Sequence, residues 1–156
     1  MKTFLLMGTA ALGALTLATS VQAGECPTSQ MRPDARTTGE TTGAKVTDTE
    51  LKDVKLGSEI KGLDMRRLRL RRLVVQPGGV VPWHSHTDRP ALIMTVSGSI
   101  TEYRSTCAVG IEHPAGDIAQ EVKGVSHWWR NNGKVAAVLL AADIKNDGAP
   151  PDGDHM

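Results

Sequence analysis

Short runs of alternating apolar and polar residues, each ended by a turn, constrain the fold of this chain more than any other feature. Between residues 46 and 144 such runs recur at a spacing of roughly 8–12 residues, which is typical of strands. Glycine, proline and asparagine separate them at 77–79, 97–98 and 131–133. No segment keeps a helical apolar period over several turns. The pattern therefore predicts an all-β sandwich or barrel.

The two ends of the chain differ from this central region in composition. Residues 1–23 contain Lys2, an apolar run and small residues before Ala23, which predicts a cleavable signal peptide and a periplasmic or secreted protein. An uncleaved N-terminal anchor is the alternative. Residues 24–45 are polar and predict a flexible arm, 46–145 the β-barrel, and 146–156, rich in Pro, Gly and Asp, a disordered tail.

Charge and cysteine content narrow the classes of partner and compartment. The chain has 18 basic and 17 acidic residues, so neither nucleic acid nor an anionic membrane is expected as its partner. Five arginines lie within 65–73, which indicates a strand with a basic outer face or, alternatively, a phosphate-binding patch. Cys26 and Cys107 either form a disulfide, as an oxidising compartment allows, or remain two free thiols.

Histidines are few, and two of them are placed as a pair. His84 and His86 are two residues apart, so in a strand both imidazoles project from one face and can bind a divalent metal. A third, His127, follows about 40 residues later. Trp83 and Trp129 lie beside these histidines, which favours an apolar pocket with a polar focus, the usual form of a small-molecule site.

Two spacing motifs built on these residues resemble those of the cupin superfamily. The first has Gly78, five residues, His84-Ser85-His86, and then Gly98. The second ends with Gly124, His127 and Asn131 and is preceded by the turn PAGD. The resemblance covers about residues 65–144. It implies a double-stranded β-helix, or jelly-roll barrel, with the histidines inside. Because related barrels often pair, it also implies a homodimer.

The resemblance implies that His84, His86 and His127 are metal ligands, with Fe, Zn, Ni or Mn as the ion. The acidic ligand of the first motif would fall at Ala91, which cannot coordinate a metal. Asp88 and Glu121 could each approach the histidines, but neither occupies the position that the motif assigns to the acid. The sequence therefore predicts a site of three histidines with no fourth protein ligand.

Two functions are consistent with such a site. The first is a metal-dependent enzyme acting on a small molecule, similar to three-histidine cupins that act as iron dioxygenases on thiols or diketones. The second is a non-catalytic module that binds a small molecule with or without metal; a purely structural metal is a third reading. Candidate substrate-binding residues are Trp83, Trp129, Arg89 and Arg130, and Glu121 is a candidate general base.

Overall fold

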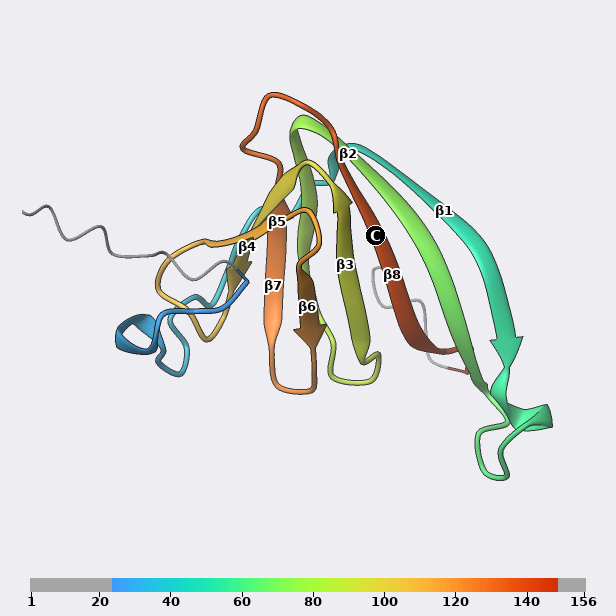
Figure 1. Cartoon of the computed structure of the whole chain (residues 1–156). Coiled ribbons are helices and arrows are strands. Elements are labelled where there is room, and N and C mark those ends of the chain that lie inside the picture. The colour runs from blue at the N-terminus through green and yellow to red at the C-terminus, as the bar shows by residue number, and fades with distance from the viewer. Residues whose placement is uncertain (1–23, 149–156) are drawn as a thin grey trace, which may run out of the picture.

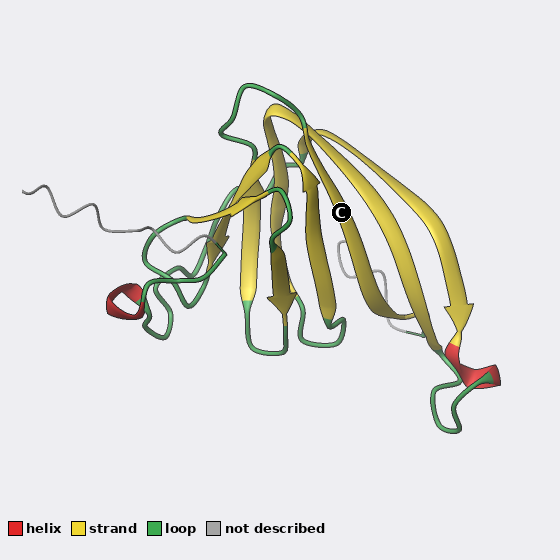
Figure 2. Cartoon of the chain, in the orientation of Figure 1, coloured by secondary structure: helices red, strands yellow, loops and turns green. Residues whose placement is uncertain are grey.

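Eight strands make up nearly all of the regular structure in the computed structural model, which describes residues 24–148 (Figures 1 and 2). The strands are β1 (Ala44–Lys55), β2 (Arg66–Ser85), β3 (Ala91–Ser97), β4 (Ser99–Arg104), β5 (Ile111–Pro114), β6 (Ile118–Glu121), β7 (Ser126–Arg130) and β8 (Ala137–Asn146). Two single-turn helices, η1 (Thr28–Gln30) and η2 (Leu56–Ser58), flank β1. The predicted signal peptide, 1–23, and residues 149–156, with His155, lie outside the described residues.

The strands form one antiparallel sheet in the order β5-β4-β7-β2-β8-β3-β6, with β1 paired to β2. β2 joins two runs that the sequence presents as separate strands. Its first half lies between β1 and β8, and after the bend near Gly78 its second half pairs with β7 (Figure 1). Gly78 and Gly98 both have a positive φ, of 73° and 74°, which L side chains rarely adopt. The all-β jelly-roll prediction is confirmed.

The segment before β1 is attached to the barrel. Cys26 and Cys107, 81 residues apart, form a disulfide, so the alternative of two free thiols is wrong. Backbone hydrogen bonds join Arg32 to Thr106 and Glu40 to Trp83. Within residues 24–148, no helix is long and apolar enough to cross a membrane.

Two of the five arginines in the first half of β2 face the opposite way from the prediction. Arg69 and Arg71 are buried, whereas Leu68 and Leu70 are 42% and 38% exposed. The expectation of a strand with a basic outer face is therefore wrong at these positions. Arg69 points inward because an acid 74 residues away is buried beside it. The side chain of Asp143 on β8 is fully buried and accepts two hydrogen bonds from Arg69, of 3.0 and 2.8 Å.

Asp143 is the centre of an ion-pair network inside the barrel. Its carboxylate lies 3.4 Å from Arg71 and 3.8 Å from Arg89. Burial alone raises the pKa of Asp143, but the hydrogen bonds and charges of the surrounding arginines hold it below its ordinary value. The other end of the barrel is apolar, with Leu73, Ile93, Ile100 and Leu139 in its core.

We predict that Asp143→Asn lowers the free energy of unfolding by about 3–5 kcal/mol at neutral pH, because it removes the buried carboxylate that accepts both hydrogen bonds from Arg69. The carboxylate has a lowered pKa in the folded state, so its contribution is present above the unfolded pKa of about 3.9. The contribution is lost as the pH falls through the folded value. Urea unfolding at several pH values measures the difference. Asp88→Asn, at an exposed pair with Arg66, is the control and is expected to cost much less. An equal loss in both variants would contradict the prediction.

Candidate metal centre

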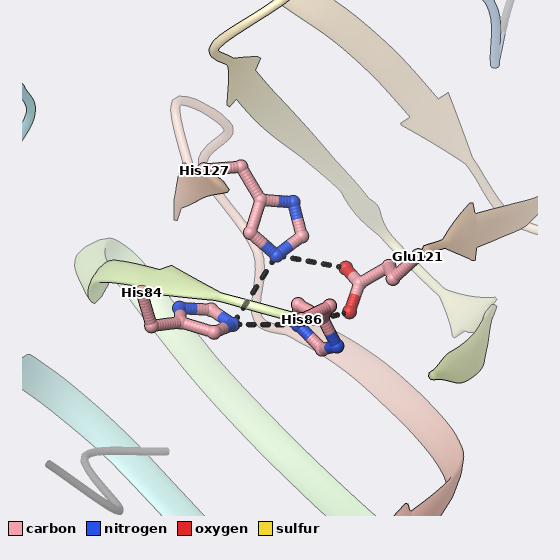
Figure 3. Close-up of side chains that lie close together, drawn as sticks. All are labelled: His84, His86, Glu121 and His127. Carbon is pink, nitrogen blue, oxygen red and sulfur yellow. Dashed lines mark hydrogen bonds and ion pairs between the residues drawn. The ribbon is translucent and has the colours of Figure 1, made fainter. Parts of the chain in front are cut away.

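Four ligand-type side chains meet inside the barrel: His84, His86, Glu121 and His127. One donor atom from each lies within 4.8 Å of all the others. Figure 3 shows the three imidazoles and the carboxylate pointing toward one another, from β2, from the segment that follows it, from β6 and from β7. His86, Glu121 and His127 are buried, and His84 is partly exposed. We call this group the His/Glu cluster.

Strand register brings the members of the cluster together. His84 on β2 lies opposite His127 on β7 in the antiparallel ladder, although 43 residues separate them. Glu121 on β6 lies opposite Ala91 on β3, and Ala91 in turn lies opposite Asp143 on β8. Side chains at facing positions of a ladder share one side of the sheet. Glu121 therefore enters the barrel beside the methyl group of Ala91.

This register overturns the prediction that no acid accompanies the three histidines. Glu121 Oε2 is 2.6 Å from His86 Nε2, and Glu121 Oε1 is 3.1 Å from His127 Nε2. The acid is absent from the motif's own strand and is supplied by the neighbouring strand. Asp88, the other acid considered, is exposed and pairs with Arg66 instead.

The outer nitrogen of each imidazole has an oxygen acceptor. His84 Nδ1 donates to the carbonyl of Pro82 at 2.8 Å, and His86 Nδ1 donates to the carbonyl of Arg89 at 2.6 Å. His127 Nδ1 donates to Glu102 Oε1. A carbonyl oxygen only accepts hydrogen bonds, so the proton of a neutral ring is held at Nδ1. Each neutral imidazole therefore turns an unprotonated Nε2 toward the cluster.

These donor atoms suit a cation better than they suit one another. The Nε2 atoms of His86 and His127 lie 2.9 and 3.2 Å from that of His84, close enough for their lone pairs to repel. Both oxygens of Glu121 are buried without an aligned hydrogen bond, although imidazole nitrogens are near. Imidazole nitrogen and carboxylate oxygen are common ligands of divalent transition metals. The four residues therefore fit a metal ion.

The pKa values of two histidines of the cluster are shifted in opposite directions. Burial and the charge of His127 lower the pKa of His84 to about 2, which keeps its ring neutral. Burial also acts to lower the pKa of His127, but the carboxylates of Glu121 and Glu102 outweigh it and raise that pKa above its ordinary value. A proton at His127 is therefore the main competitor of a metal.

A second layer of charged groups supports His127. Glu102 is fully buried and contacts His127, Arg104 at 2.9 Å and His113 Nε2 at 3.2 Å. The opposite nitrogen of His113 contacts Asp117 at 2.6 Å. Burial raises the pKa of Glu102, but hydrogen bonds from His113 and His127 bring it below its ordinary value, so it is ionised. Outer carboxylates of this kind fix the tautomer and orientation of a ligating histidine.

Sequence reasoning missed Glu102, although a signal was present. Ile100 and Glu102 are two residues apart on β4, and Ile100 belongs to the apolar core. Their shared parity places the acid inside. For Glu121 the comparable signal is Ala119 on β6, whose parity is the same. Neither pattern indicates which residue the buried acid contacts.

The candidate substrate-binding residues lie in different surroundings. Trp129 is buried, and its ring centroid is 5.6 Å from that of His127, as strand parity predicts. Trp83 is partly buried beside the N-terminal segment. The side chain of Arg89 is 17% exposed and lies near Asp143, whereas Arg130 is 42% exposed and lies 3.8 Å from Glu40. Trp129 thus contacts the cluster through its ring, and Arg89 contacts it through its backbone carbonyl, which lies 2.6 Å from His86 Nδ1.

A cavity of about 440 Å³ lies between the start of β1 and the second half of β2, and no member of the His/Glu cluster lines it. Its lining includes Val46, Asp48, Val81 and Pro82. Pro82 is the residue whose carbonyl holds His84, the partly exposed member of the cluster. The volume is within the range of small-molecule sites.

Comparison with known proteins agrees with this architecture. A family model described as cupin domain matches residues 71–143. Nectarin-1 of Nicotiana plumbaginifolia is 26% identical over 103 residues, which are 64% of this chain and 42% of that protein. The chain thus spans about two fifths of the curated relative that it matches.

Solved structures share the fold at low sequence identity. A predicted oxalate decarboxylase of Thermotoga maritima superimposes with a TM-score of 0.55 at 21% identity, over 77% of this chain and 97% of that one. The cupin domain of Schizosaccharomyces pombe Cnp3 gives a TM-score of 0.51 at 12% identity, over 66% of each chain. Family model, shared fold and both histidine motifs agree, and residues 71–143 of this chain form a cupin domain.

Proposed function

We propose that this cupin binds one divalent metal ion through His84, His86, Glu121 and His127 and uses it for chemistry on a small molecule. The observation that carries the proposal is the His/Glu cluster, in which four buried or partly buried donor atoms face one another. The three Nδ1 protons are held by oxygen atoms outside the cluster. When bound, the ion would supply Lewis acidity toward a substrate oxygen.

The donor count favours an ion that accepts more than four ligands. Zinc bound by four protein groups is coordinatively closed and is typical of structural sites. Ions that prefer six ligands, such as Fe(II) or Mn(II), would keep positions for a substrate. We therefore propose iron or manganese. The link to three-histidine thiol and diketone dioxygenases rested on the missing acid, and Glu121 removes that basis.

Residues of this chain around the cluster support binding of a small molecule with an acceptor oxygen. Trp129 Nε1 is buried and has no hydrogen-bond partner among the described residues, so it is available as a donor. The partly exposed His84 marks the accessible side of the cluster. Glu121 contacts two imidazoles, so it serves here as a ligand rather than as the general base that the sequence suggested.

Metal analysis followed by a turnover assay tests this function. We expect about one equivalent of iron or manganese per chain, and product formation with a panel of small oxygen-containing substrates. Ligand binding without turnover in the metal-loaded protein would instead assign the non-catalytic binding module. One tightly held zinc without activity would assign a structural site.

We predict that Glu121→Ala weakens metal affinity at least about 100-fold, since loss of an outer-layer partner alone costs about 10–100-fold. His84→Ala is expected to act in the same direction. Isothermal titration with Mn(II) measures both. Asp88→Ala is the matched control, because this exposed acid lies outside the cluster. Unchanged affinity in Glu121→Ala would remove Glu121 from the ligand set.

The facing positions of β3 and β6 allow a transposition experiment. We predict that Ala91→Glu, added to Glu121→Ala, restores most of the metal affinity, because the two residues lie opposite each other in the ladder. Their Cβ atoms are expected to be about 4.5–5.5 Å apart, so a glutamate from either strand reaches the same space. The control is Gln120→Glu in the Glu121→Ala background, since position 120 faces outward and should restore nothing.

Metal affinity is predicted to fall as the pH drops, because binding requires an unprotonated Nε2 at His127. The pKa of His127 is raised, so the fall begins at a higher pH than for an ordinary imidazole. In Glu102→Gln one of the two carboxylates that raise this pKa is removed, so the fall should shift to lower pH. Overall affinity in that variant should drop about 10–100-fold at neutral pH. Metal titrations from about pH 5 to 8 measure both effects. Identical pH profiles in the two proteins would contradict the role of Glu102.

A further inference from the structure

Gly24, the first residue that the structure describes, lies against the barrel. Its backbone nitrogen donates a hydrogen bond to the carbonyl oxygen of Glu112 on β5, at 2.8 Å. A Cβ atom placed on Gly24 would lie 2.4 Å from Asp117 Oδ1 and 2.5 Å from Asp117 Oδ2. Because this ideal Cβ and the backbone nitrogen are bonded to the same Cα, the nitrogen lies within about 5 Å of the carboxylate. A glycine, which has no side chain, allows this close approach.

The segment that carries Gly24 is anchored close by. Cys26 forms a disulfide with the buried Cys107, and Met31 forms a β-bridge with the same residue. Gly24 is therefore two residues from a covalent anchor, which restricts its nitrogen to a radius of about 7 Å. A group that is already confined loses little entropy when it binds, so a single ion pair at this place is effective.

Asp117 is fixed as well, in the turn between β5 and β6. Its backbone N–H donates to the carbonyl of Pro114, and its own carbonyl accepts from the N–H of Thr95. Its Oδ2 atom lies 2.6 Å from His113 Nδ1, and its side chain is 24% exposed. An ionised carboxylate accepts several hydrogen bonds. Since both oxygens of Asp117 lie beside Gly24, the carboxylate can accept further hydrogen bonds from that side.

We propose that removal of residues 1–23 makes Gly24 the N-terminus and that its α-ammonium group then binds the carboxylate of Asp117. The apolar run and the small residues that end at Ala23 are the pattern that signal peptidases cleave. Hydrolysis of the bond between Ala23 and Gly24 consumes one water, so that Ala23 departs as a carboxylate and the nitrogen of Gly24 becomes –NH3+ at neutral pH. The amide has one N–H, which binds Glu112, whereas the ammonium has three. Cleavage therefore creates two donors and a positive charge within reach of Asp117.

The other carboxylates near this position suit the ammonium less well. Glu112 Oε2 accepts a hydrogen bond from Thr101 Oγ1 at 2.9 Å, so that carboxylate is already engaged. Glu25 is exposed, and ion pairs in water contribute little. Asp117 is thus the partner that the geometry favours.

This pairing connects processing of the chain to the groups that support the metal centre. From Asp117 the contacts continue through His113 to Glu102, and from Glu102 to His127. The side chains of His113, Glu102 and His127 are at most 1% exposed, so Asp117 is the outer end of the series. The ammonium adds a positive charge at that end and holds the carboxylate beside His113. The pairing itself rests on geometry and charge, and it does not depend on the proposed metal function.

Competitive acetylation of the processed protein tests the pairing. The full chain is expressed in a bacterial host, its first residue is identified by mass spectrometry, and the acetylation rate of its α-amine is measured against pH. We expect Gly24 as the first residue and an α-amine pKa at least about 0.5 higher than in Asp117→Asn, since an ion pair stabilises the protonated amine. Glu25→Gln is the matched control, because it removes one negative charge next to Gly24 in sequence; it should leave this pKa nearly unchanged.

A second protein changes no side chain of the barrel. A chain that begins at Ala23, released from a cleavable fusion, carries its ammonium about 3.8 Å further along the backbone and should lose the raised pKa. Four results each overturn the proposal: a processed chain with another first residue, an unchanged α-amine pKa in Asp117→Asn, an unchanged value in the chain that begins at Ala23, or an equal fall in Glu25→Gln. Circular dichroism identifies a variant that fails to fold, and the chain that begins at Ala23 then decides.

Discussion

The interior of this barrel depends on one constraint: three imidazole nitrogens and a carboxylate lie close together. Lone pairs at these distances repel unless a proton or a cation lies between them. Each ring is held in place against that repulsion by a hydrogen bond from its Nδ1 atom. The acceptors are the carbonyls of Pro82 and Arg89 and the carboxylate of Glu102. The folded state thus loses stability at the cluster, and burial of the apolar core, which includes Leu73, Ile93 and Leu139, offsets the loss.

The sequence was sufficient for what depends on local pattern. Alternation and turn residues predicted the all-β barrel, and the two-residue spacing of His84 and His86 predicted their common direction. Contacts that depend on register between strands distant in sequence could not be predicted. Glu121 meets the histidines only because β6 pairs with β3 in one particular alignment. Spacing along a single strand carries no information about that alignment.

The prediction that the arginines of β2 face outward was wrong at Arg69 and Arg71 for a related reason. Charged side chains are expected to face water, and this expectation holds unless a buried partner exists. The partner of Arg69 is on β8, and nothing in the local sequence of β2 indicates it. Once the arginines turn inward, alternation forces the leucines between them outward. The ion pairs inside the barrel and the exposed leucines outside it therefore have the same cause, which is the face of β2 that points inward.

The position of Glu121 on β6 also has a kinetic meaning. β7 pairs with both β2 and β4, and His127 itself lies opposite His84 and Arg104, whereas β6 has four residues and, among the described residues, pairs only with β3. Strands at a sheet edge open more readily than central strands, because fewer hydrogen bonds must break. Glu121 thus comes from an edge strand, and His127 comes from a strand that is paired on both sides. If the His/Glu cluster held an ion, its carboxylate ligand would therefore lie on the strand that opens more readily, and the imidazole of His127 on a strand that opens less readily.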